Sequence, residues 1–68
     1  MKQFTKKQLA QKVWVTCYRQ KKEMTRKEAI ETYFEGMVCC DGSEAERYQR
    51  IYCQLMEGFR QVTDERDY

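Results

Sequence analysis

The sequence has 68 residues but no histidine and no proline. Histidine is the side chain that proteins use most often as a general base and as a metal ligand. Its absence excludes a nucleophilic cysteine activated by histidine. The four cysteines do not compensate as metal ligands, because Cys39 and Cys40 are adjacent and lack the C-x2-C spacing of structural zinc sites. We predict no metal and no other cofactor, while a redox role for these vicinal thiols stays open.

Carboxylates arranged for acid–base catalysis are also missing. Glu28, Glu31 and Glu35 are spaced along one face of a predicted helix, where water solvates them. A chain of this length forms one domain, and so small a domain has little room for the concave pocket that catalysis needs. We predict that the protein is not an enzyme and acts by binding.

The sequence has no long apolar run. None approaches the roughly 20 residues that span a bilayer, and residues 1–7 lack the apolar stretch of a signal peptide. The predicted location is the cytoplasm, where thiols stay reduced. Small domains often need added stabilisation, and without disulfides or a metal the remaining source is self-association.

Charge is unevenly distributed, although the net charge is only +2. Residues 1–27 carry nine basic side chains and one acidic one, Glu23, whereas residues 28–68 carry four arginines and ten acidic side chains. Such asymmetry indicates either an anionic partner for the basic end or pairing between the two ends, within one chain or between two. Two solvated faces that compensate each other are the simpler alternative.

Two helices folded back on each other are predicted over residues 25–59. Thr25 and Glu28 have the spacing of a capping box, which marks a helix start. Apolar residues then recur at helical spacing, as expected of one buried face: Ile30, Tyr33, Phe34, Met37 and Val38. Gly36 lies inside this helix, where it permits a neighbouring element to approach closely, and Gly42 is placed to end the helix.

The second helix of this hairpin begins directly afterwards. Ser43 and Glu46 form another predicted capping box, and Gly58 is placed to end the helix. Its apolar stripe comprises Ala45, Tyr48, Ile51, Tyr52, Leu55, Met56 and Phe59. The short connection requires that the two helices run antiparallel and in contact. Residues 60–68 have no helical period and are predicted to form a flexible tail.

The segment before the hairpin supports two structures. Thr5 and Gln8 mark a helix start, and the apolar positions that follow fit an amphipathic helix over about residues 6–21. Residues 13–18, however, favour strands, and their apolar positions also alternate.

The predicted fold is therefore a single all-α domain over residues 1–68, with three helices. The alternative is an α+β fold, in which residues 13–18 form a strand paired to the tail around Gln61-Val62-Thr63.

The candidate binding residues are aromatic and basic. The aromatic side chains exceed what so small a core encloses, and tyrosines suit an interface because their tips are polar. Aromatic and basic residues interleaved near the N-terminus could also stack on bases and contact phosphates. The candidates are Trp14, Tyr18, Lys21, Lys22, Tyr33, Tyr48 and Tyr52.

Two kinds of partner are predicted. A protein comes first, either another protein or a second copy whose acidic hairpin meets the basic end of the first. A nucleic acid bound by the basic N-terminal segment is the alternative. Glu44 and Glu46 argue against the alternative in the form of a helix-turn-helix, because they would repel phosphates at the start of the third helix.

Several stretches carry a resemblance: Met24-Thr25-Arg26-Lys27-Glu28-Ala29-Ile30, then Tyr33 and Gly36, Gly42-Ser43-Glu44-Ala45-Glu46-Arg47-Tyr48, and Thr63-Asp64-Glu65. In this pattern the chain resembles small uncharacterised proteins of gut anaerobic bacteria that are often encoded beside plasmid, conjugative-element or phage genes. The resemblance implies an accessory protein of a mobile element, acting as a regulator or inhibitor of a host protein such as a CRISPR nuclease. It transfers no functional residue.

Overall fold

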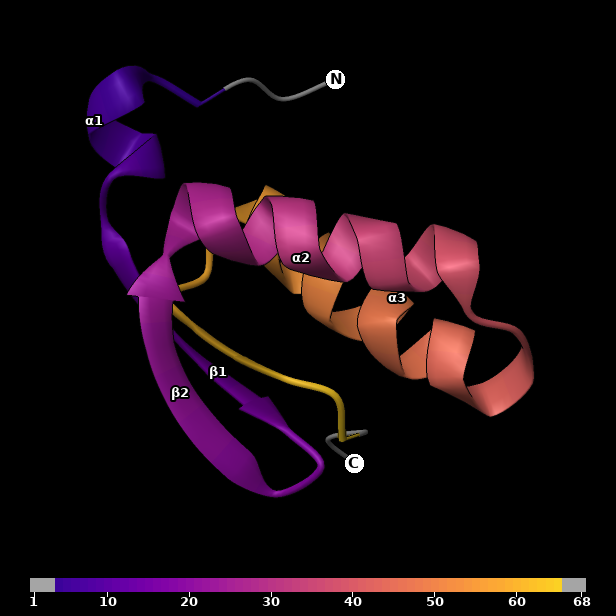
Figure 1. Cartoon of the computed structure of the whole chain (residues 1–68). Coiled ribbons are helices and arrows are strands. Elements are labelled where there is room, and N and C mark those ends of the chain that lie inside the picture. The colour runs from indigo at the N-terminus through magenta and orange to yellow at the C-terminus, as the bar shows by residue number, and fades with distance from the viewer. Residues whose placement is uncertain (1–3, 66–68) are drawn as a thin grey trace.

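The computed structural model describes residues 4–65 and consists of two layers (Figure 1). Two antiparallel helices form one layer, and a three-stranded sheet forms the other. In chain order the elements are α1 (Lys6–Leu9), β1 (Lys12–Cys17), β2 (Gln20–Thr25), α2 (Arg26–Cys39), α3 (Gly42–Glu57) and β3 (Gln61–Thr63). The fold is α+β, so the prediction of an all-α domain with three helices is wrong.

The error lies in the segment before α2. The helix predicted over residues 6–21 covers only Lys6–Leu9, and the chain then enters β1. This strand pairs in parallel with β3, where Val15 lies opposite Val62. Residues 61–63 therefore belong to the sheet rather than to a flexible tail. This agrees with the α+β alternative, which paired a strand over residues 13–18 with the segment around them. Residues 66–68 of the predicted tail lie outside the described residues.

β1 and β2 form an antiparallel hairpin that the sequence did not predict. Its two turn residues, Tyr18 and Arg19, both have positive φ, at 52° and 66°. Turns of this kind match the twist of the flanking strands but usually contain asparagine, aspartate or glycine. Here the backbone N–H of Tyr18 donates to Asp64 Oδ2 at 3.1 Å, so a residue from the far end of the chain supports the turn.

The core lies between the helix pair and one face of the sheet. Alternate strand residues share a face, so Val13 and Val15 point toward the helices while Trp14 points away. The buried apolar residues are Val13, Val15, Ala29, Tyr33, Ile51, Leu55 and Val62. The sheet covers only part of each predicted helical stripe: Phe34 and Val38 of the first stripe and Phe59 of the second are exposed.

The contact of α2 with α3 agrees with the sequence signals, and the predicted capping box at the start of α2 is formed in its Thr25 half. The Thr25 hydroxyl oxygen accepts a hydrogen bond from the backbone N–H of Glu28 at 3.2 Å. Halfway along α2, a Cβ added to Gly36 would lie 2.9 Å from Tyr48 Cδ2. The predicted close approach at this glycine is confirmed.

The two ends of α3 agree only in part with those predicted from the sequence. Gly58 ends the helix in the left-handed conformation, with φ of 101°. The cap predicted at Ser43 is wrong, because α3 already begins at Gly42 and is preceded by Asp41, whose side chain makes no capping hydrogen bond. Gly42 does adopt the expected positive φ, at 65°, but Cys40 caps the end of α2.

Candidate functional site

The structure distributes the predicted binding residues over three places. Trp14 and Lys21 lie together on the face of the sheet that the helices leave uncovered. Four others, Tyr18, Lys22, Tyr33 and Tyr48, line a hollow between the hairpin and the helices. Tyr52 lies elsewhere on α3, against Phe34. The candidates therefore do not form one site.

The uncovered face of the sheet is polar and basic around one aromatic ring. Trp14 lies on the central strand and is 40% exposed. The Lys21 Nζ atom lies 5.2 Å from the centre of the Trp14 ring, within range of a cation–π interaction. Glu23 and Gln61 occupy the neighbouring positions on β2 and β3. The ring is thus open to solvent and framed by polar side chains.

The hollow between the hairpin and the helices has a volume of about 390 Å³. Tyr33 and Tyr48 pack there with ring centres 5.7 Å apart. Burial raises the pKa of Tyr33 to about 12, and burial followed by the nearby Asp64 carboxylate raises the pKa of Cys17 to about 11. Both groups are therefore neutral at pH 7, and neither has the lowered pKa of an activated nucleophile.

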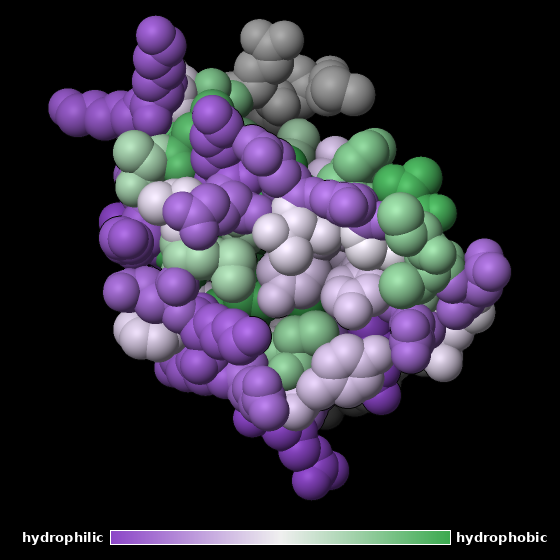
Figure 2. All heavy atoms as spheres, in the orientation of Figure 1, coloured by the Kyte–Doolittle hydropathy of each residue, from purple (hydrophilic) through white to green (hydrophobic). Residues whose placement is uncertain are grey.

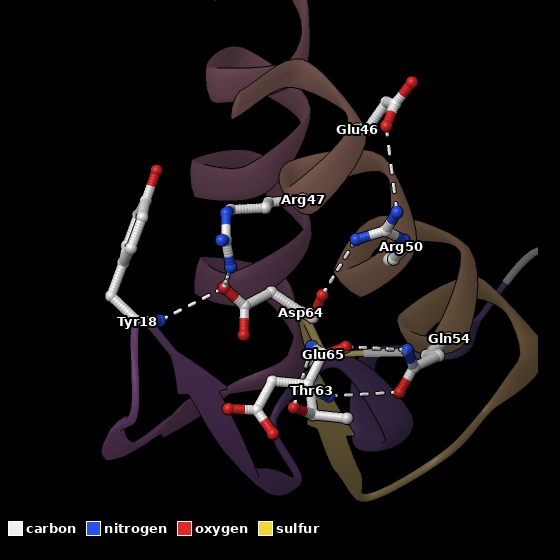
Figure 3. A network of polar contacts seen from close by, with 8 residues as sticks. All are labelled: Tyr18, Glu46, Arg47, Arg50, Gln54, Thr63, Asp64 and Glu65. Atoms are coloured by element: carbon white, nitrogen blue, oxygen red, sulfur yellow. Dashed lines mark hydrogen bonds and ion pairs between the residues drawn. The ribbon is translucent and has the colours of Figure 1, made fainter. Parts of the chain in front are cut away.

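A polar network that the sequence did not reveal centres on Asp64 (Figure 3). This carboxylate is completely buried, and its Oδ2 atom lies 2.9 Å from Arg47 Nη1 on α3. The same oxygen accepts the hydrogen bond from Tyr18, and the Arg47 guanidinium carbon lies 4.9 Å from the centre of the Tyr18 ring. The second oxygen, Oδ1, is buried and accepts no hydrogen bond of ordinary geometry from residues 4–65. The network joins the hairpin turn, β3 and α3.

Two further α3 side chains hold the last residues of the sheet. Gln54 donates from its amide nitrogen to the carbonyl of Thr63 at 2.8 Å and accepts from the Thr63 backbone N–H at 3.1 Å (Figure 3). Arg50 donates to the backbone carbonyl of Asp64 at 3.2 Å. The outer edge of β3 is therefore paired with side chains. Its polar sequence carries no signal for this arrangement, because the partners lie on another element.

A buried arginine holds the opposite end of the helix pair together. Arg26, at the start of α2, is 2% exposed and donates to the carbonyls of Leu55 and Gly58 at 2.8 and 3.1 Å. Carbonyls at a helix C-terminus lack partners within the helix and carry partial negative charge. Burial, followed by the positive charge of Arg60, lowers the pKa of Arg26, yet an arginine stays charged at neutral pH. These contacts explain Arg26 as a structural residue.

The outer surface of the helix pair carries exposed apolar side chains. Phe34 is 48% exposed and its ring centre lies 5.5 Å from that of Tyr52, so this contact bridges α2 and α3. Val38, about one turn further along α2, is 66% exposed. Figure 2 shows apolar residues reaching the surface at the end of the molecule where α2 ends in Figure 1. We call Phe34, Val38 and Tyr52 the apolar helix patch.

The uneven charge of the sequence becomes a difference between the two layers. The β1–β2 hairpin has four exposed basic residues around Glu23: Lys12, Arg19, Lys21 and Lys22. The helix pair instead carries exposed acidic residues: Glu28, Glu31, Glu35, Asp41, Glu44, Glu46 and Glu57. The protein thus has a basic layer and an acidic layer.

The cysteines offer little support for redox or metal chemistry. All four are free thiols. Burial, followed by the charge of Glu44, raises the pKa of Cys40, which disfavours the reactive thiolate. Within residues 4–65 no three side chains among histidine, cysteine, aspartate and glutamate are grouped to hold a metal ion. In the same part of the chain, no helix is both long and apolar enough to cross a membrane.

Comparison of the chain with family models, curated proteins and solved structures finds no significant match.

Proposed function

We propose that the protein is a non-enzymatic domain that binds another protein through the apolar helix patch. The observation that carries this proposal is the position of Phe34, which packs on Tyr52 yet remains 48% exposed beside the more exposed Val38. Contiguous exposed apolar side chains on a small domain often mark an interaction surface. Aromatic residues at such places supply much of the binding free energy.

The size of the patch suits a binding anchor. Full burial of a phenylalanine or valine side chain is worth about 1.5–3 kcal/mol. Phe34 and Val38 are roughly half to two-thirds exposed, so a partner that covers both would gain about half of this from each, on the order of 2–3 kcal/mol together. This free energy is enough for the central contact of an interface, and polar contacts around that centre must supply the rest of the affinity.

The rim indicates the chemistry of the partner. Glu31 and Glu35 are exposed and precede Phe34 and Val38 by three positions, so they lie next to the patch on the helix. An apolar surface bordered by lysine or arginine would complement this arrangement. A second copy that packed its own patch here would bring like charges together around a two-fold axis, so it is a poorer fit than another protein.

This proposal keeps the role expected from the resemblance, a small regulator or inhibitor of a host protein. Such a protein acts by occupying a surface of its target, which needs a rigid patch and no catalytic group. Gly36 supports rigidity of the helix pair, because it lets Tyr48 of α3 pack directly against α2.

The proposal is tested by comparing which proteins the chain retains from its native cell lysate. Val38→Lys places a charge inside the patch, and a cation near a helix C-terminus does not destabilise the helix. Gln20→Lys adds the same charge on the exposed end of the hairpin and serves as the control. We expect a protein that wild type and Gln20→Lys retain and Val38→Lys loses. Equal retention by all three, or no retained protein, would contradict the proposal.

A further inference from the structure

We propose that the uncovered face of the sheet binds single-stranded RNA, with one base stacked on Trp14 and phosphates held by Lys12 and Lys21. This face lies on the other layer from the apolar helix patch, so the inference does not rest on the proposed function.

The pairing register places these residues on one surface. Thr16 lies opposite Lys21 and Trp14 lies opposite Glu23, while Lys12 shares the face of Trp14 because it is two residues away on β1. Val13 and Val15 point the other way into the core. The alternation of side chains along β1 thus places Trp14 on the binding surface and its neighbours Val13 and Val15 in the core.

Trp14 has the position of a stacking platform. A tryptophan on the central strand of a sheet is ordinarily covered, yet here 40% of it is exposed and no helix of residues 4–65 lies on this side (Figure 1). A flat ring open on one face accepts any base, because every base has an aromatic face. The Lys21 ammonium lies over the ring, 5.2 Å from its centre, so a base that stacks there displaces it toward the adjoining phosphate.

The charges along the face favour a polyanion. Lys12, at the start of β1, and Lys21, on β2, both lie on this face. Glu23, directly opposite Trp14, is the acidic residue on this surface and opposes phosphate binding. The positive charges outnumber it, so the net field still attracts a phosphate backbone.

The shape and the polar neighbours indicate the type of nucleic acid. A sheet face with a central aromatic residue stacks on bases that are unpaired, and a duplex does not offer them. Thr16 and Gln61 are the neighbours of Trp14 on the same face, along β1 and across on β3. Hydroxyl and amide groups beside a stacked base can bond to its edges and to the ribose 2′-hydroxyl. RNA therefore fits this surface better than DNA.

The test uses the fluorescence of Trp14, which is the one tryptophan of the chain. Titration with oligouridylate at low salt should quench this fluorescence, because a stacked base contacts the indole directly. The logarithm of the binding constant should fall with the logarithm of salt concentration with a slope of about −1.4, as expected for two phosphate contacts on a single strand. Oligodeoxyuridylate, which lacks only the 2′-hydroxyl groups, should bind more weakly.

Two adjacent lysines provide a matched pair of variants. Lys21 points to the uncovered face, whereas Lys22 lines the hollow on the helix side. Lys21→Gln should weaken binding and reduce the magnitude of the salt slope by about 0.7, and Lys22→Gln should leave the slope unchanged. Glu23→Gln should strengthen binding. Trp14→Leu, followed by the anisotropy of labelled oligouridylate, should lower affinity about tenfold.

Several results would overturn the inference. They are the absence of quenching by oligouridylate, equal losses from Lys21→Gln and Lys22→Gln, equal binding of oligodeoxyuridylate, and tighter binding of a duplex. Val38→Lys should bind oligouridylate like the wild type, which also shows that the variant is folded. The oligonucleotide titrations test this proposal, and the lysate experiment tests protein recognition by the apolar helix patch. Either proposal can therefore fail without the other.

Discussion

The Arg47 guanidinium lies 2.9 Å from the buried carboxylate of Asp64 and so joins α3 to the end of β3. The same Asp64 oxygen accepts the backbone N–H of Tyr18 in the hairpin turn. One carboxylate near the C-terminus therefore stabilises both a left-handed turn and the parallel pairing of β1 with β3.

Removal of this carboxylate should destabilise the protein. In Asp64→Ala the Tyr18 N–H and the Arg47 guanidinium lose a buried acceptor, so we expect a loss of about 2–3 kcal/mol in the free energy of unfolding, measured by urea denaturation. Glu46→Ala is the control, because its ion pair with Arg50 is longer, at 3.7 Å, and exposed; it should change stability by less than about 0.5 kcal/mol. Equal effects of the two variants would contradict the role of Asp64.

Substitution of the buried Arg26 should lower the stability of the protein. Arg26→Met keeps much of the buried volume but leaves the carbonyls of Leu55 and Gly58 without these donors. We expect a loss of about 2–4 kcal/mol in urea denaturation. Arg26→Lys should recover only part of it, since an ammonium group lacks the planar fork of guanidinium. Lys27→Ala, at the exposed next position, is the control. A stability of Arg26→Met close to wild type would show that these bonds contribute little.

Alkaline pH should destabilise the fold partly through Cys17. Burial, with the neighbouring Asp64 carboxylate, raises the pKa of this thiol from 9.0 to about 11. Between these values the unfolded chain loses the thiol proton while the folded chain retains it, so stability is fully present below pH 9 and falls as pH rises toward 11. Urea denaturation across this range should show a shallower fall for Cys17→Ala than for wild type.

The exposed Cys53 supplies the control for this pH dependence. Cys53→Ala should follow the wild-type dependence, because this exposed thiol lies outside the buried surroundings of Cys17. If Cys17→Ala and wild type lose stability in parallel between pH 9 and 11, the half-buried Cys17 thiol is not responsible.

Replacement of Gly36 by alanine should destabilise the protein. Alanine gains about 1 kcal/mol of helix propensity, but its Cβ would lie 2.9 Å from Tyr48 Cδ2. We expect Gly36→Ala to lower the free energy of unfolding by about 1–2 kcal/mol, as overpacking does. In a Tyr48→Ala background the same change should instead stabilise, because the clash is gone. A stabilising effect of Gly36→Ala in the wild type would show that α2 and α3 can separate at low cost.

The sequence predicted those elements whose signals are local. Thr25 caps α2, Gly36 permits a close approach and Gly58 ends α3. It failed at Ser43, because α3 begins at Gly42, so that Ser43 lies within the first turn of the helix rather than at its cap. Capping residues and glycines act within a few positions of the chain and can therefore be recognised without the fold.

The hairpin could not be predicted because its support is not local. Tyr18 and Arg19 are unusual in a left-handed turn, and Gln20-Lys21-Lys22-Glu23 is too polar to signal a strand. The turn is held by Asp64, which lies 46 positions from Tyr18. An edge strand with one face on the helices needs little apolar character of its own. Recognising residues 20–25 as a strand thus required knowing its partner.

The candidate site was predicted by residue type but not by arrangement. The exposed aromatic ring of Trp14 and the nearby Lys21 do lie together, as the interleaved pattern suggested. Tyr33, in contrast, is a core residue, and Phe34, expected in the core, is exposed. These two neighbours on α2 differ because the sheet covers only one side of the helix, and the sequence pattern does not show the width of the sheet.

The central claim is that the apolar helix patch recognises another protein. Its most direct measurement is photo-crosslinking in the native cell, with p-benzoylphenylalanine in place of Val38 and, for comparison, in place of Gln20. We expect the group at position 38 to crosslink to one protein other than this chain and the group at position 20 not to do so. Crosslinks from position 38 only to a second copy of the chain, or the same products from both positions, would contradict it.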